Sequence, residues 1–523
     1  NGSSLVRRYN IAYEANLSSA SRSRVASITE CAGAGGTDCL PATTFSYTNG
    51  TNTFDASANQ AVVTVPGTRT IMMDANGDGR SDLIFPSATA YTTGYWKIAH
   101  ADGSGNYSSA ITTSVSSYYQ GWATPIDYNA DGKGDLLYTD GSTWWVAQSN
   151  GNGFDAPINT GATSVGASDV RAFDANGDGL EDLIWSTTTT VKYRLREWGG
   201  AFSATIYTLL TGPTNTTAIW LEDPLQSRNH SLAPDFNGDA HADLMVTIEK
   251  TIWSQGEDYV YYIGDIVLSG TGEVIYVGTS AQGFPGDFNG DGLTDLAIPG
   301  GTGWFYRFGT GTGLTTAVYG AAITGHQWWL AVPTDWDGDG FTDIMVPSSS
   351  AGTWQVVRSN GESLPTVVNT GVVVGASLAA DFFADTNGDG LTDVVTIGYG
   401  TGTVGIIKHS GVVPDLMNSA IDGFGNAVNF SYGMLSGGAL YNRGSNAQFP
   451  YQDYSGPVSV VTNANISDGI GGTYNLASFY YEGAAVQRQG RGFAGFRYPS
   501  WIDSRDNTAQ RRTYKREFPF TGM

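Results

Sequence analysis

Seven short apolar segments recur along the central part of the chain, and each follows a polar loop rich in Asp, Asn and Gly. The segments are mostly Leu, Ile, Val, Met and aromatic residues and are apolar on both faces, which is typical of buried inner strands. Helical periodicity is hard to find, so the pattern predicts an all-β protein. The segments are Leu83–Phe85, Leu136–Tyr138, Leu183–Trp185, Leu244–Val246, Leu296–Ile298, Ile344–Val346 and Val394–Thr396.

The loops follow the pattern D-x-N-x-D-G-x-x-D, and their starts lie 47 to 61 residues apart, which indicates a repeat architecture. Each unit has the same predicted order: a strand ending at the first Asp, the apolar strand, a third strand often marked by Trp, a turn and a fourth strand. Four antiparallel strands per unit are typical of a propeller blade. We therefore predict a seven-bladed β-propeller.

The ends of the repeat predict how the ring closes. The last unit lacks a fourth strand after Ile407, whereas Gln60–Val65 stands before the first unit, where an outer strand would be. We expect the N-terminal strand to complete the last blade, because closed folds pair their edge strands.

Each loop offers oxygen atoms at alternate positions of a tight turn, and neither Cys nor His stands at a ligand position, which favours calcium over zinc or copper. An EF-hand is excluded because no loop has Glu at position twelve. The predicted ligands are Asp74, Asn76, Asp78, Asp82; Asp127, Asn129, Asp131, Asp135; Asp174, Asn176, Asp178, Asp182; Asp235, Asn237, Asp239, Asp243; Asp287, Asn289, Asp291, Asp295; Asp335, Asp337, Asp339, Asp343; and Asp385, Asn387, Asp389, Asp393.

A single such loop could equally be a plain β-turn whose Asp and Asn serve only their own backbone. Seven copies favour metal, because they hold 22 of the 49 acidic residues and crowded carboxylates repel one another without a cation. We expect up to seven Ca²⁺ ions. The fourth loop should lose its ion first, since Ala240 replaces the glycine. The sixth, with Asp337 in place of Asn, should hold its ion most tightly.

Charge and composition argue against a nucleic-acid-binding protein and against a transmembrane helix. The formal net charge of −23 argues against nucleic-acid binding, which needs a basic face. No apolar run reaches the eighteen residues of a transmembrane helix, and the chain opens without an export signal, so that any such signal is absent or already removed. Cys31 and Cys39 could form a disulfide or remain two thiols.

The chain divides into three predicted parts: an N-terminal β segment (1–55), the propeller (56–412) and a β-rich region (413–523). The last part turns basic after Val486, with eight Lys or Arg against three acids. This basic segment could dock an acidic partner or face the acidic propeller. Trp96, Trp145, Trp304 and Trp354 could stack on sugars, although core packing between sheets is the better interpretation.

Around the propeller the sequence resembles a known family. The loops resemble FG-GAP or VCBS repeats, the calcium-bearing units of integrin α-type propellers. The flanking segments resemble the bacterial Rhs and insecticidal toxin-complex B group. The YD repeats, self-cleavage segment and toxin domain of that group do not follow in this sequence. The segments that carry the resemblance are 21–31, 39–45, Ile421–Asn426, Tyr432, Phe449–Pro450, Gly456–Val458, Tyr480–Gly483, Arg491–Phe496, Thr513–Tyr514 and 518–522.

Catalysis finds little support, because the five His are scattered and no HExxH, GxSxG or phosphate-binding loop is present. We therefore expect no enzyme. The resemblance implies a secreted or cell-surface scaffold that docks or gates another protein, and the alternative is a calcium-dependent lectin or adhesin that binds glycans. We expect recognition on the loops at the propeller faces, which vary in length; the longest interval runs from Asp182 to Asp235, and its loop segment is Trp198 to Asn229.

Overall fold

The computed structural model shows an all-β chain, as predicted. Within the described residues the helices are two short 3-10 turns, η2 (Trp328–Leu330) and η4 (Leu435–Gly437), and no helix has the length and apolar character needed to cross a membrane. The structure describes residues 6–14, 22–33, 38–55, 58–65, 70–119, 123–163, 169–199, 201–221, 234–239, 241–254, 257–267, 273–279, 283–300, 303–320, 326–348, 352–361, 366–373, 381–398, 402–445, 447–489, 491–519 and 521.

Seven four-stranded antiparallel sheets make up the repeat, and they are numbered here in chain order. The first four consist of β6 (Ile71–Met73), β7 (Asp82–Pro86), β8 (Tyr95–Ala99) and β9 (Ile111–Ser116); β10 (Thr124–Ile126), β11 (Asp135–Thr139), β12 (Thr143–Ala147) and β13 (Ile158–Thr163); β14 (Asp169–Phe173), β15 (Asp182–Ser186), β16 (Thr190–Arg194) and β17 (Tyr207–Thr211); and β18 (Thr216–Leu221), β19 (Leu244–Ser254), β20 (Glu257–Val267) and β21 (Val274–Thr279).

The other three sheets follow the same order. They consist of β22 (Phe284–Gly286), β23 (Asp295–Pro299), β24 (Trp304–Arg307) and β25 (Val318–Tyr319); β26 (Val332–Thr334), β27 (Asp343–Pro347), β28 (Thr353–Arg358) and β29 (Thr366–Val373); and β30 (Asp381–Ala384), β31 (Asp393–Ile397), β32 (Thr403–Ile407) and β5 (Ala58–Thr64). The seventh sheet confirms the predicted pairing of the N-terminal strand, because β5 lies antiparallel to β32 as its fourth strand.

Hydrophobic clusters join each sheet to the next. The apolar segments predicted from the sequence form the second strand of each sheet, and their side chains enter the core because both faces of that strand are covered. One cluster joins the first sheet to the last, where Leu83 and Phe85 of β7 share a core with Val395 of β31 and Ile406 of β32. Six further clusters join the sheets in chain order.

The tryptophans of the third strands belong largely to this core. Trp96, Trp304 and Trp354 are at most 2% exposed, so core packing and not sugar stacking explains them. In the second sheet the buried residue is Trp144, and Trp145 points the other way, since neighbouring residues of a strand face opposite sides of the sheet.

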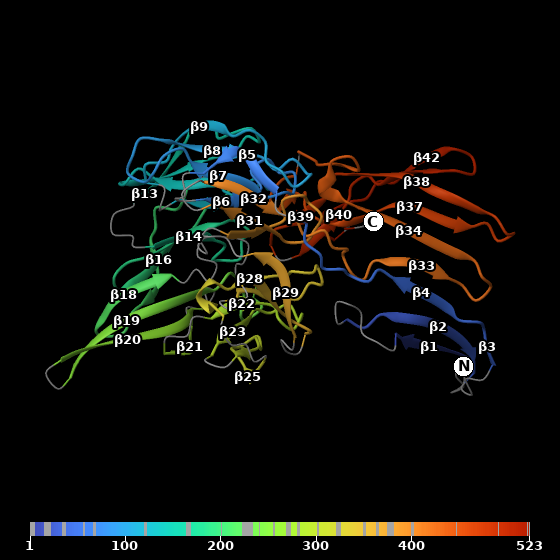
Figure 1. Ribbon diagram of the computed structural model, residues 1–523, viewed down its shortest axis with the longest axis horizontal. Coiled ribbons are helices and arrows are strands. Elements are labelled where there is room, and N and C mark those ends of the chain that lie inside the picture. The colour runs from blue at the N-terminus through green and yellow to red at the C-terminus, as the bar shows by residue number, and fades with distance from the viewer. Residues whose placement is uncertain are drawn as a thin grey trace.

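The N-terminal and C-terminal parts of the chain share one sheet, which extends to one side of the seven small sheets (Figure 1). Its strands are β1 (Arg7–Tyr13), β2 (Val25–Ala32), β3 (Asp38–Cys39), β4 (Thr43–Tyr47), β33 (Met417–Ile421), β34 (Ala427–Met434), β35 (Tyr441–Asn442), β37 (Ser459–Ser467), β38 (Thr473–Glu482), β41 (Ser500–Asp503) and β42 (Thr508–Arg511). A disulfide joins Cys31 to Cys39 across β2 and β3.

A small three-stranded sheet lies between the extended sheet and the seven small ones. It consists of β36 (Tyr451–Asp453), β39 (Ala485–Gln487) and β40 (Gly492–Gly495) (Figure 1). These strands position the side chains that reach the polar loops of the repeat.

The expectation that Trp198 to Asn229 is one long face loop is wrong. This interval contains β17 and β18, the last strand of the third sheet and the first of the fourth. Runs of Thr with Leu, Ile or Trp provide both strands, because β-branched and aromatic residues favour extended backbone. Residues 222–230, at the end of the interval, lie outside the described residues.

The longest projection is instead the β19–β20 hairpin. Its pairing runs from Leu244 with Val267 to Ser254 with Glu257, whereas β18 pairs only as far as Lys250 and β21 only as far as Ile263. The outer end of the hairpin therefore extends beyond both neighbouring strands (Figure 1).

Candidate metal sites

The ninth residue of every loop is a buried Asp that ties the loop to its own sheet. These seven carboxylates are at most 1% exposed. In the first loop, Asp82 accepts hydrogen bonds from the backbone N–H of Ala75 (3.1 Å) and of Ala101, just beyond β8 (2.8 Å). The same arrangement holds Asp135, Asp182, Asp295, Asp343 and Asp393. The ninth residue thus has a structural role that the ligand pattern did not indicate.

The other predicted ligands face the interior of the same turn. Asp74 accepts hydrogen bonds from the backbone N–H of Gly77 (2.6 Å), Asp78 (3.1 Å) and Gly79 (2.7 Å), and Asn76 donates to Asp78 (3.0 Å). The first Asp of the other six loops accepts backbone N–H groups from its own loop in the same way. These hydrogen bonds order the turn of each loop, but among the described residues only the sixth loop brings three carboxylates within 4.8 Å of one another.

In the fourth loop, Asp235, Asn237 and Asp239 form the same hydrogen-bonded turn, and Asp243 is buried behind them. Ala240, on which the expected weakness of this loop depends, lies outside the described residues.

Neighbouring loops are hydrogen-bonded to each other. In five loops the backbone N–H of the eighth residue donates to the carbonyl of the first Asp of the preceding loop, as Gly134 does to Asp74 (2.7 Å) and Thr294 to Asp235 (2.9 Å). In the other two the side chain of the eighth residue makes the link, since Thr392 donates to the carbonyl of Asp335 and Glu181 accepts the N–H of Asp127. Ser81 of the first loop donates to Asp385 of the last (2.9 Å), so that this contact also crosses from the first sheet to the seventh.

Burial removes these carboxylates from water and so disfavours their charged form, which nearby positive charge does not restore. It raises the pKa of Asp74, Asp295 and Asp393 to about 7 and that of Asp182 to about 8, against hydrogen bonds that act in the opposite direction. A divalent cation within the turn would offset this cost, so the chemistry of the donor set fits a hard, oxygen-binding ion.

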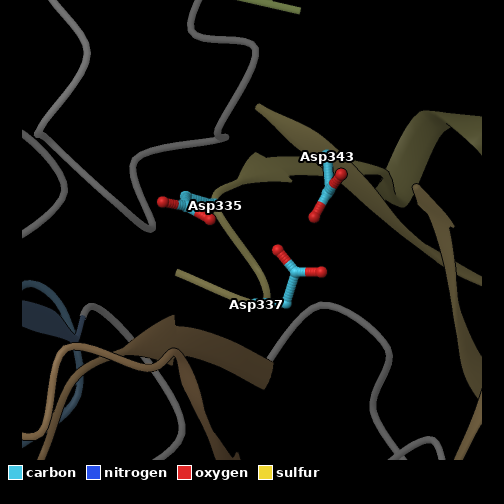
Figure 2. A group of neighbouring side chains, drawn as sticks. All are labelled: Asp335, Asp337 and Asp343. Carbon is cyan, nitrogen blue, oxygen red and sulfur yellow. The ribbon is translucent and has the colours of Figure 1, made fainter. Parts of the chain in front are cut away.

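The sixth loop shows the fit most directly. Carboxylate oxygens of Asp335, Asp337 and Asp343 lie within 4.8 Å of one another (Figure 2). Asp337 is 2% exposed, and its Oδ1 atom has no hydrogen-bond partner. However, the guanidinium of Arg358 on β28 pairs with the other oxygen of Asp337 at 2.6 Å. A positive charge already enters this loop, and it opposes the tight ion binding expected there.

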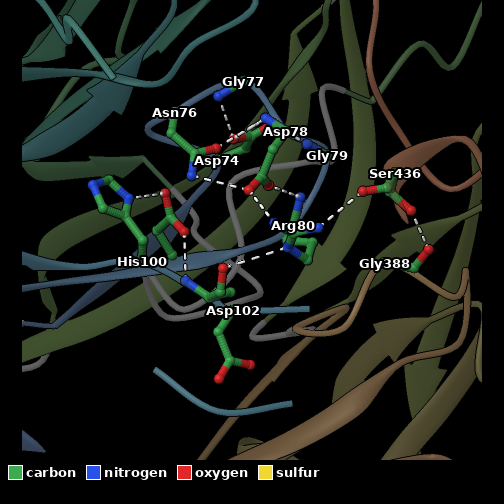
Figure 3. Close-up of polar contacts among 12 residues, drawn as sticks. Asp74, Asn76, Gly77, Asp78, Gly79, Arg80, His100, Asp102, Gly388 and Ser436 are labelled. Carbon is green, nitrogen blue, oxygen red and sulfur yellow. Dashed lines mark hydrogen bonds and ion pairs between the residues drawn. The ribbon is translucent and has the colours of Figure 1, made fainter. Parts of the chain in front are cut away.

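The first loop connects the first sheet to the seventh and to the C-terminal part of the chain (Figure 3). Arg80 pairs with Asp78 at 2.5 Å and donates to the carbonyl of Ser436 at 2.9 Å, while the Ser436 hydroxyl donates to the carbonyl of Gly388 in the seventh loop. His100 contacts Asp82 through Nδ1 at 2.9 Å, which raises the pKa of this histidine.

The second and third loops are covered by the three-stranded sheet and its neighbours. Gln452 donates to Asp127 at 2.5 Å, Arg443 donates to the carbonyl of Asp131, and Arg488 lies 3.7 Å from Asp127 and donates to the carbonyl of Gly179 at 3.1 Å. Arg488 belongs to the basic C-terminal segment, so at this residue the segment faces the acidic loops. The sequence carries no local signal for these three residues as loop partners.

The loops also surround a cavity of about 500 Å³. The first Asp of the first, sixth and seventh loops (Asp74, Asp335 and Asp385) lines it, together with Ser81 and Thr392. The cavity therefore lies among inner strands of sheets that are far apart in the sequence.

Family models match two kinds of segment. Residues 365–517 match the insecticide toxin TcdB middle/N-terminal region, and residues 127–185 and 287–346 match the FG-GAP-like repeat. None of the curated proteins matches the chain.

Solved structures share the fold. A chain of the Photorhabdus luminescens Tc holotoxin pore is similar over 99% of this chain, with a TM-score of 0.59 and 16% identity. A TcdB2-TccC3 chain without its hypervariable C-terminal region is similar over 99% of this chain, with a TM-score of 0.50 and 12% identity. This chain spans 23% of the length of each.

These matches identify the chain first as an all-β protein with FG-GAP-like repeats. The match over residues 365–517 confirms the resemblance of the segments after the repeat to the toxin-complex B group, and the solved structures share the fold of the chain.

Proposed function

We propose that the seven sheets form a closed seven-bladed propeller of the integrin-α type, with a Ca²⁺ ion in each loop. Two contacts support closure: the hydrophobic cluster shared by the first and seventh sheets, and the hydrogen bond from Ser81 to Asp385. A closed ring also leaves no edge strand of the repeat without a neighbouring sheet.

Calcium would be held by the first, third, fifth and ninth side chains of each loop and would supply the positive charge that the buried carboxylates lack. The fourth loop, with Ala240, is proposed to bind most weakly. Because the loops are hydrogen-bonded to one another, an ion in one loop also stiffens its neighbours.

We further propose that the protein is a secreted, non-catalytic scaffold of a toxin-complex-B-like assembly. The observation that carries this proposal is the contact of Arg443, Gln452 and Arg488 with the loops, which holds the TcdB-like region against the repeat. The loop carboxylates are engaged with backbone and metal and are unsuited to acid-base work. The Cys31–Cys39 disulfide suits an oxidising, extracellular compartment.

Docking of another protein is proposed at the projecting end of the β19–β20 hairpin, whose outer residue pairs lie beyond the last pairs that the described residues of β18 and β21 make with it. The test replaces residues 251–260 by a two-residue Asn-Gly turn and measures co-elution with the other components of the cognate toxin complex on size exclusion. We expect the variant to keep its melting temperature and to lose co-elution. Unchanged co-elution by the folded variant would contradict docking through this hairpin.

A further inference from the structure

A second hollow, of about 510 Å³, lies between the first and second sheets, away from the polar loops. Its walls are aromatic: Tyr118 and Tyr119 follow β9, Tyr138 ends β11, and Trp145 lies on β12. One acidic residue, Asp140, also lines the hollow. The other lining residues are Thr93, Ser116, Thr139 and Pro157.

The aromatic rings are held in place by specific contacts. Tyr138 and Trp145 are a directly opposed pair across β11 and β12, and the rings of Tyr118 and Tyr119 meet edge to face, with centroids 4.9 Å apart. The Tyr119 ring lies over Gly141, where an added Cβ atom would come within 2.6 Å of the ring. Glycine at this position therefore allows the ring to approach.

Asp140 presents a negative charge beside these rings. Its Oδ1 atom accepts the backbone N–H groups of Ser142 and Thr143 (both 2.8 Å), and its Oδ2 atom accepts the indole N–H of Trp145 (2.9 Å). Burial acts to raise the pKa of this carboxyl, but these hydrogen bonds outweigh it and lower the pKa to about 2. Asp140 is thus ionised at any physiological pH.

The other sheets do not repeat this arrangement. The positions that correspond to Tyr138 and Trp145 are Phe85 and Lys97 in the first sheet and Val346 and Gln355 in the sixth. Tyr138 belongs to the core between the first and second sheets and Trp145 packs against that core, while the exposed part of the pair is available to a ligand.

We propose that this hollow binds a small organic cation with a quaternary ammonium group, such as choline. The faces of Tyr and Trp rings attract such cations, and a nearby carboxylate adds a second attraction. Neither Lys nor Arg lines the hollow, so that an anionic group has no partner there.

Isothermal titration calorimetry of the whole chain tests the proposal with choline and with 3,3-dimethylbutan-1-ol, which has the same shape but no charge. Choline should bind and quench Trp fluorescence, and the neutral analogue should bind about tenfold more weakly or worse. Absence of choline binding, equal affinity for the two compounds, or binding of methyl glycosides in place of choline would overturn the proposal.

Two variants locate the site. Asp140→Asn keeps an oxygen for the Ser142 and Thr143 N–H groups but turns an NH2 group toward the Trp145 indole N–H, so it should lower the melting temperature slightly while weakening choline binding about tenfold. Tyr118→Leu should also weaken binding, whereas the control Tyr319→Leu, at a similarly exposed tyrosine of β25 (47% against 38%), should not. Wild-type affinity in a folded Asp140→Asn protein would refute the role of the carboxylate.

Discussion

Arg358 brings a positive charge into the sixth loop, where the sequence predicts only carboxylate ligands around an ion. It lies on β28, nineteen residues after Asp339, and its guanidinium enters the sixth loop from the third strand of the same sheet. The spacing of Asp335, Asp337, Asp339 and Asp343 predicts four carboxylates around one ion, but a spacing rule within a loop contains no information about side chains that enter from another strand.

Replacing Arg358 by Gln should tighten calcium binding in the sixth loop by about tenfold or more, because a positive charge within a few ångströms of the ion is removed. Terbium luminescence excited at the red edge of Trp absorption, where Tyr128 of the second loop does not absorb, reports on the site through Trp336, the second residue of this loop. Equal or weaker affinity in the variant would show that Arg358 does not compete with the ion.

His409 provides a pH test. It is fully buried between Phe54 and Trp336, and burial lowers its pKa from 6.5 to about 4. A depressed folded pKa gives stability that is complete above the unfolded pKa of 6.5 and is lost as the pH falls toward 4, by up to about 3 kcal/mol. His409→Phe should therefore reduce the loss of unfolding free energy between pH 7 and pH 5 in urea titrations.

The control is His100→Gln. The pKa of His100 is raised, chiefly by its hydrogen bond to Asp82, so its contribution is present below the unfolded pKa and disappears as the pH rises through the folded pKa. This variant should not reduce the acid-induced loss. An acid-induced loss as large in His409→Phe as in the wild type would contradict the assignment.

Among the secondary-structure elements, local sequence patterns predicted most of the repeat. Strand pairing between segments far apart in the sequence was largely not predicted. The seven loops and the strands after them follow from short sequence periods, and β5 was predicted because the last sheet needed a fourth strand. The shared sheet was missed, since β4 and β33 pair across about 370 residues and nothing local indicates the partner. Trp145 was predicted as the core residue of its strand, whereas the structure buries Trp144. An error of one residue along a strand exchanges its two faces.

The contact between the C-terminal region and the loops is testable as a unit. Arg443→Ala with Arg488→Ala should increase hydrogen exchange in β36, β39 and β40 while leaving the inner strands of the repeat protected, since each lost charge-assisted hydrogen bond costs about 1–3 kcal/mol locally.

The control for this pair is Arg505→Ala, because Arg505 is bound to Asp503 at 2.7 Å within the extended sheet. If the double variant and this control show the same exchange in the three-stranded sheet, the loop contacts do not hold that region in place.

At the scale of the whole molecule, buried charge is concentrated where the sheets meet. Six of the seven sheets end their first strand directly at the loop, the ninth Asp of every loop is buried, and hydrogen bonds join adjacent loops. Much of the acidic charge of the chain therefore lies in these loops, and metal binding would act on the seven linked sheets as one unit. The extended sheet, which lacks such loops in its described residues, should respond less to metal.

Differential scanning calorimetry in EDTA and in excess Ca²⁺ measures whether metal ions stabilise the seven sheets of the repeat. An ion that binds only the folded protein adds about 2.7 kcal/mol per site at a free concentration one hundred times its Kd. The melting temperature of the repeat should therefore fall by roughly 10 °C or more in EDTA and return when Ca²⁺ is restored. Superimposable melting curves in chelator and in calcium would contradict the account.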